Sequence, residues 1–60
     1  MTAKEAESLL LKNHFVLKRS KGSHRIYVRK GKRIVIPFHA GKTLHPKIVK
    51  EVLQSINIDA

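Results

Sequence analysis

Four histidines are the side chains of this chain that could do acid–base chemistry near neutral pH. They stand at positions 14, 24, 39 and 45, and the chain has no cysteine. Histidine has the ordinary pKa closest to neutrality, so it can take up and release a proton under physiological conditions. We single out His24 and His39, because each is expected where a strand meets a loop and an exposed side chain is held by an ordered backbone. His14 and His45 stand at expected helix ends, where we interpret them as capping or solvent-exposed residues.

Basic residues surround these histidines in the sequence. The chain has 13 lysines and arginines against 4 acidic residues, a formal net charge of +9, and positions 8–50 contain no acidic residue. Such a concentrated positive charge predicts a polyanionic partner, nucleic acid first and an acidic protein second. The candidates for phosphate contact, for which a solvated face is the alternative, are Lys18, Arg19, Lys21, Arg25, Arg29, Lys30, Lys32 and Arg33.

Histidine combined with lysine and arginine suits metal-independent cleavage of RNA. That reaction needs a base for the 2′-hydroxyl, an acid for the leaving 5′-oxygen and cations for the charge that develops around phosphorus. Metal-dependent hydrolysis is disfavoured, because Glu5, Glu7, Glu51 and Asp59 all lie near the chain ends. No serine has an acid and a histidine arranged as a triad. The sequence therefore predicts neither a metal nor a cofactor.

The length predicts a single domain, residues 1–60, with a thin core. A chain of this size buries only about 60% of the surface that its unfolded form exposes. Without cysteine it has neither a disulfide nor a Cys–His zinc motif. No apolar run approaches the roughly 20 residues that span a bilayer, and the first residues lack the pattern of a secretory signal. We therefore expect a soluble, cytoplasmic protein with no membrane partner.

Local patterns predict five elements. Thr2-Ala3-Lys4-Glu5 matches a capping box and predicts a helix that ends near Asn13. Alternating residues predict half-buried strands over 15–19 and 25–29 and a third strand over 33–38, with Gly31 in a tight hairpin turn. Pro46 and the apolar spacing after it predict a second helix. The expected fold class is two-layer α+β, a three-stranded antiparallel sheet with two helices on one face.

The position of His24 within this fold poses a geometric question. The pattern assigns Ile26 and Val28 to the face of the second strand that meets the helices, and by alternation His24 shares that face. Either His24 extends beyond the helical cover, or a bulge turns it outward. Because the second and third strands are expected to be antiparallel, the start of one lies near the end of the other, and His39 is expected close to His24.

Three segments, in order along nearly the whole chain, resemble the HicA toxins, the mRNA interferases of HicA–HicB toxin–antitoxin systems. They are Gly22-Ser23-His24 followed by Ile26 and Tyr27, the run Ile36-Pro37-Phe38-His39-Ala40-Gly41-Lys42, and the pattern Leu44, Pro46, Val49, Val52, Leu53. One departure is visible, since Lys47-Ile48 stands where many members have Gly-Thr at the start of the last helix. We expect this departure to alter helix capping rather than chemistry.

The resemblance implies a double-stranded-RNA-binding-domain-like fold and a toxin that acts as a translation-independent endoribonuclease on mRNA, with His24 as the catalytic general acid/base. Gly22, Ser23 and Lys42 lie in the matching segments and join the candidate RNA contacts, and His39 is the candidate accessory catalytic residue. The implied partner is a HicB-like antitoxin that covers the active site, so that DNA is met only indirectly through it. The alternatives are a non-catalytic double-stranded-RNA-binding module and a protein whose basic face receives an acidic partner.

Overall fold

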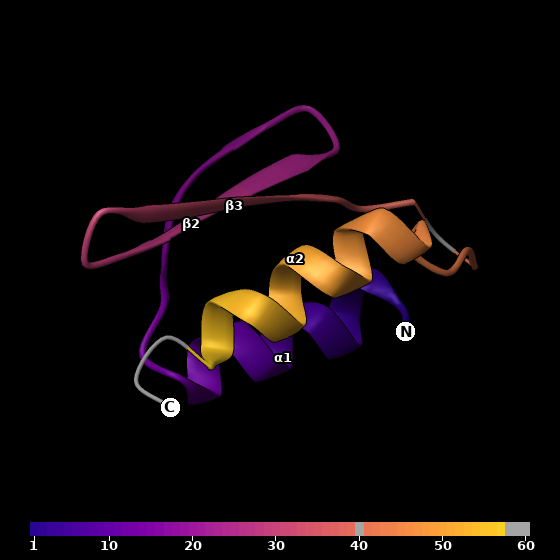
Figure 1. Cartoon of the computed structure of the whole chain (residues 1–60). Helices are drawn as coiled ribbons and strands as arrows, with labels where there is room; N and C mark the ends of the chain where they lie inside the picture. The colour runs from indigo at the N-terminus through magenta and orange to yellow at the C-terminus, as the bar shows by residue number, and fades with distance from the viewer. Residues whose placement is uncertain (40, 58–60) are drawn as a thin grey trace.

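The chain folds into two layers, an antiparallel sheet and two helices that cover one face of it (Figure 1). The structure is a computed structural model that describes residues 1–39 and 41–57. Ala40 and positions 58–60, which include Asp59, lie outside the described residues. The elements are α1 (Ala3–Lys12), β1 (Val16–Lys21), β2 (His24–Arg29), β3 (Lys32–Pro37) and α2 (Pro46–Ile56). The predicted α+β class and the order α-β-β-β-α are confirmed.

Helix α1 begins and ends where the sequence predicts. The Thr2 hydroxyl accepts a hydrogen bond from the Glu5 amide at 3.2 Å, and the Glu5 carboxylate accepts one from the Thr2 amide at 2.8 Å, which completes the capping box. Asn13 is the C-cap, and His14 follows with a φ of 72°, in the left-handed region. The buried face of the helix consists of small residues and one leucine, so α1 packs closely against its neighbours.

Helix α2 begins with Pro46, and His45 caps it. The His45 Nδ1 atom accepts a hydrogen bond from the Lys47 amide at 3.0 Å, as the capping interpretation predicts. The predicted apolar stripe is only partly buried. Val52 is fully buried, but Leu53 is 43% exposed. Ser55 is buried instead, and its hydroxyl donates to the Val52 carbonyl at 2.8 Å, which satisfies the polar group inside the helix.

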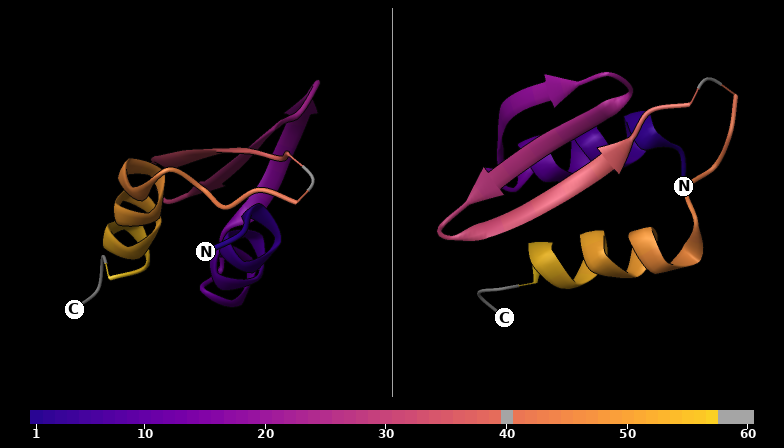
Figure 2. Two further views of the ribbon diagram at one scale, coloured as in Figure 1. Left: turned by 90° about the vertical axis from the view of Figure 1, so that its right-hand side faces the viewer. Right: turned by 90° about the horizontal axis from the view of Figure 1, so that it is seen from above.

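The sheet is a meander of order β1-β2-β3 with two-residue connections. Gly22 and Gly31 stand in these turns with φ of 59° and 78°, values that favour glycine, and the turn prediction for Gly31 is confirmed. Figure 1 shows α1 and α2 on the same side of the sheet, and in the right-hand view of Figure 2, from above, α1 lies behind the sheet and α2 runs alongside β3. The strands are shifted from their predicted bounds by one or two residues, because hairpin pairing continues up to the turns.

The predicted half-buried pattern of the first strand is wrong. Every residue of β1 is exposed, and Leu17 is 43% exposed although it lies opposite the buried Tyr27. Phe15 is buried, but it precedes the strand and fills the core from the connection between α1 and β1. The reason is position, since β1 is an edge strand and alternation alone does not tell whether a helix covers it.

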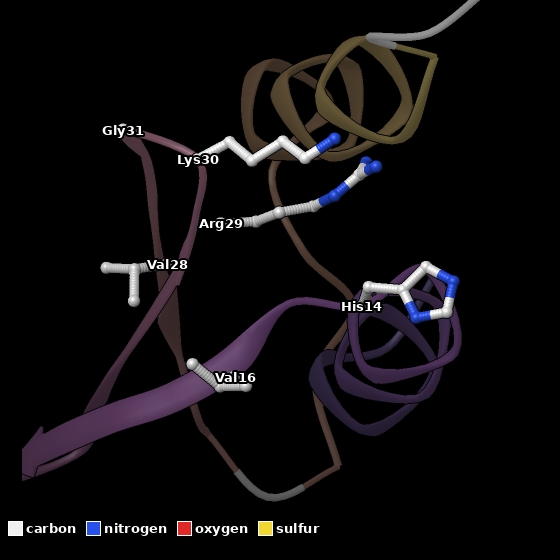
Figure 3. A pocket seen from close by; sticks show the side chains of 6 residues that line it. All are labelled: His14, Val16, Val28, Arg29, Lys30 and Gly31. Carbon is white, nitrogen blue, oxygen red and sulfur yellow. The ribbon is translucent and has the colours of Figure 1, made fainter.

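The predicted facing of β2 is also wrong. Tyr27 is fully buried in the core together with Ile34 and Ile36, so the odd-numbered residues of β2 point to the helices. Ile26 and Val28 therefore point to the open face, and Figure 3 shows Val28 directed away from the helices while Arg29 extends toward them. The large Tyr27 ring offers more apolar area to the core than a valine does, and its hydroxyl finds a partner there.

Candidate active site and nucleic-acid interface

His24 is the first residue of β2, directly after the Gly22-Ser23 turn, and its side chain is exposed. By alternation it lies on the open face of the sheet, the face without helices. The sequence left two alternatives, that His24 extends beyond the helices or that a bulge turns it outward, and the structure shows neither. His24 does share a face with Ile26 and Val28, and that face is the open one. In the pairing register His24 lies opposite Lys21 of β1 and opposite Pro37 of β3.

A β-bulge in β1 determines which basic residues share the face of His24. The pairing runs from Leu17 opposite Tyr27 directly to Arg19 opposite Ile26, which leaves Lys18 as the extra residue. Because directly opposed residues share a face, Arg19 lies on the open face. Lys21 joins it through its pairing with His24. No residue pattern along the chain indicates this bulge.

A hollow of about 420 Å³ lies beside His24, along the β3 edge next to α2. It contains both charge signs, with Arg33 from the start of β3 and Glu51 from the middle of α2. Its apolar residues come from the strand and from the helix. The residues that line it are His24, Arg33, Ile34, Val35, Pro37, Ile48 and Glu51. The fold thus brings a carboxylate into the surroundings of a histidine that has none near it in the sequence.

Arg25 points to the opposite face and is held there by α1. Its Nη1 atom donates to the Glu7 carboxylate at 2.9 Å, the Tyr27 hydroxyl donates to the same carboxylate oxygen, and the guanidinium lies 4.1 Å from the centre of the Phe38 ring. The hydrogen bond from Tyr27, followed by that from Arg25, lowers the pKa of Glu7. Burial and the bond to Glu7 raise the pKa of Tyr27. This cluster fixes α1 to the sheet.

The remaining basic candidates of the second hairpin lie at the far end of β2 from His24. Arg29 and Lys30 line a hollow of about 500 Å³ together with His14 (Figure 3). Lys32 pairs with Arg29 across the hairpin and shares its side of the sheet. Arg29, Lys30 and Lys32 therefore stand apart from His24, beside which the pairing places Lys21 and Arg19. Arg33 pairs with Val28 toward the far end of β2 and is linked to His24 through the hollow that both residues line.

His39 lies beyond the end of β3, two residues past the partner of His24. The Phe38 amide donates to the Ser23 carbonyl at 2.7 Å, so the Gly22-Ser23 turn and the end of β3 are joined. His39 is exposed and lines two other hollows, each of which also contains Lys42. Both histidines are thus at one end of the sheet, but His39 does not line the hollow beside His24.

Two carboxylates that no sequence pattern assigned to a site take part in these arrangements. Glu7 and Glu51 belong to helices that flank the long stretch without acids, and each is carried back onto that stretch by the fold. A signal existed for Glu51, since it stands three residues after Ile48 and so lies on the same side of the helix. Within residues 1–39 and 41–57, no three His, Cys, Asp or Glu side chains are grouped as metal ligands. None of the helices in this part of the chain is long and apolar enough to cross a membrane.

Comparison with known proteins gives one result. A family model described as the HicA toxin of bacterial toxin–antitoxin matches residues 3–58 of the 60. A search of curated proteins and a search of solved structures each found no match. The match covers both helices and all three strands, and it includes the Gly22-Ser23-His24 turn.

Proposed function

Because the chain belongs to the HicA toxin family of bacterial toxin–antitoxin systems, we propose that it is an mRNA interferase, a metal-independent endoribonuclease that uses His24 as general acid/base. The chain works in the cytoplasm on mRNA, independently of translation. It needs no cofactor for this reaction, since the attacking nucleophile belongs to the substrate.

His24 carries the proton in this reaction. The substrate's 2′-oxygen attacks the adjacent phosphorus as its proton leaves, and the bond to the 5′-oxygen breaks as that oxygen gains a proton. Lys21 and Arg19 stabilise the extra negative charge on the phosphoryl oxygens. DNA binds through the same phosphate contacts but is not cut, because it lacks the 2′-hydroxyl.

The observation that carries the proposal is the place of His24 on the open face. The side chain is exposed, stands on the first residue of a central strand, and has Lys21 directly opposite. A phosphate that approaches this face meets a histidine and two cations of β1 without any helix in the way. Arg25, next in the chain, contributes indirectly, because its bonds to α1 hold the start of β2 in place. His39 remains our proposed second proton-transfer residue.

The test is cleavage of single-stranded RNA by the purified protein in EDTA. Changing His24 to Ala should lower the rate by about a hundredfold or more, the range of a general acid/base, and should leave RNA binding and the urea unfolding midpoint unchanged. His39→Ala, measured in parallel, should lower the rate if His39 supplies the second proton transfer. DNA of the same sequence should stay intact.

His14→Asn is the matched control. His14 is also exposed, but it lies near the far end of β2, and asparagine tolerates its positive φ. This variant should cleave at the wild-type rate. Equal cleavage by His24→Ala, or a strict need for metal, would refute the assignment. RNA that is bound and left intact by the wild type would favour the non-catalytic double-stranded-RNA-binding module.

We also propose that a HicB-like antitoxin covers this face. Val16 is 58% exposed and pairs with Val28, so an apolar strip lies beside the cations Arg19 and Lys21. A partner with an apolar centre and acidic rim fits that combination, and by covering His24 it would stop the reaction. Operator DNA would be contacted by the antitoxin and only indirectly by this chain.

A further inference from the structure

The hollow beside His24 differs from the rest of the basic surface because it contains a carboxylate. Glu51 projects from α2, and within residues 1–39 and 41–57 it has no hydrogen-bond or ion-pair partner. Glu7, by contrast, is fully engaged by Arg25 and Tyr27. A carboxylate repels phosphate, so Glu51 makes this hollow a poor place for the RNA backbone. It suits a group that offers N–H donors.

The other walls of the hollow suit a flat, apolar ring. Val35 and Pro37 come from β3 and Ile48 from α2, and all three are partly buried. Single-stranded RNA presents unstacked bases whose faces pack against such side chains and whose edges form hydrogen bonds. The volume, about 420 Å³, leaves room for a base with its ribose.

We propose that this hollow binds the nucleobase next to the scissile phosphate, and that Glu51 is the specificity residue that reads it. The inference rests on the proposed ribonuclease activity. Guanine fits best, because its N1–H and N2–H donors lie side by side and match the two oxygens of one carboxylate. Uracil fits worst, because carbonyl oxygens flank its N3–H donor and face the carboxylate. The chain therefore prefers to cut beside guanine.

The experiment is digestion of a pool of randomised single-stranded RNA, followed by sequencing of the fragment ends. Wild type should show guanine enriched over uracil at one position next to the cut, by about fivefold to a hundredfold, the discrimination of a bidentate pair. Glu51→Gln keeps the size of the side chain but loses the paired acceptors. It should still cleave, with the guanine enrichment largely removed.

Lys50→Gln is the control, because it changes the charge of the neighbouring residue on α2, which does not line the hollow. It should keep the guanine preference of the wild type. If Glu51→Gln only raises cleavage equally at all sequences, Glu51 acts by repelling phosphate and the inference is overturned. Cleavage by the wild type without base preference overturns the inference alone. An RNA pool left intact by the wild type overturns the proposed function and the inference with it.

Discussion

The two faces of β2 have different surroundings, and adjacent residues of the strand point to opposite faces. Arg25 and Tyr27 point to the helices, where Glu7 of α1 holds both. His24 and Ile26 point to the open face, where no helix covers the sheet. One strand thus fixes the helices with one set of side chains and places the exposed His24 on the other side with the alternate set.

The contrast between these faces shows how a small domain can keep a histidine exposed while most of its hydrophobic core lies on the other side of the sheet. Among the described residues, the helix-facing side bears the main core cluster, with Tyr27, Ile36 and Val52 fully buried. On the open face Ile26 is also buried, but His24 is exposed and Val28 and Val35 are only partly buried, so these three can change with a smaller loss of stability. The site that we propose around His24 then lies on the side of the sheet that the main core cluster does not occupy.

The largest expected effect is a difference in unfolding free energy between substitutions at two neighbouring residues of β3. Ile36 is fully buried against the helices, whereas Val35 lies on the open face and is only partly buried. Ile36→Ala should lower the free energy of unfolding by about 2–5 kcal/mol, the cost of a large-to-small change in a core. Val35→Ala should cost about 1 kcal/mol or less. Urea titrations followed by circular dichroism measure both, and equal costs would mean that the open face is also a core.

A smaller effect is expected for the hydroxyl of Tyr27. Tyr27→Phe keeps the buried ring and removes one hydrogen bond to a carboxylate, so it should cost about 1–2 kcal/mol of unfolding free energy. The rate of RNA cleavage should stay the same, since this change touches only the helix-facing side. A lower rate at a temperature where the variant is still folded would show that the two faces are coupled.

The smallest effect concerns pH. The folded protein holds the pKa of Glu7 below its usual value, first through the Tyr27 hydroxyl and then through Arg25. The charged group therefore stabilises the fold above the unfolded pKa of about 4.3, and this contribution is lost as pH falls through the folded pKa. Wild type should unfold at higher urea than Glu7→Gln at about pH 6, and the gap should close toward about pH 2. A gap that stays constant would contradict the linkage.

Much of the fold follows from local signals. The Thr2–Glu5 capping box, Pro46 and Gly31 each act through backbone groups within a few residues, so the sequence itself specifies where these elements begin or turn. The order of helices and strands follows in turn from the short links. Residue bounds, by contrast, move by one or two positions, because they depend on how far the strands pair.

What the sequence by itself determined is the class of fold, the positions of the histidines and the excess of positive charge. The tertiary structure alone decided which face each side chain occupies. Alternation cannot choose between Tyr27 and Ile26 as the inner residue, because both are apolar and only the helices settle which one is covered. The bulge at Lys18 and the return of Glu51 to His24 depend on contacts between distant segments. Such contacts leave no periodic trace in the sequence, so the surroundings of His24 could be known only once the chain was folded.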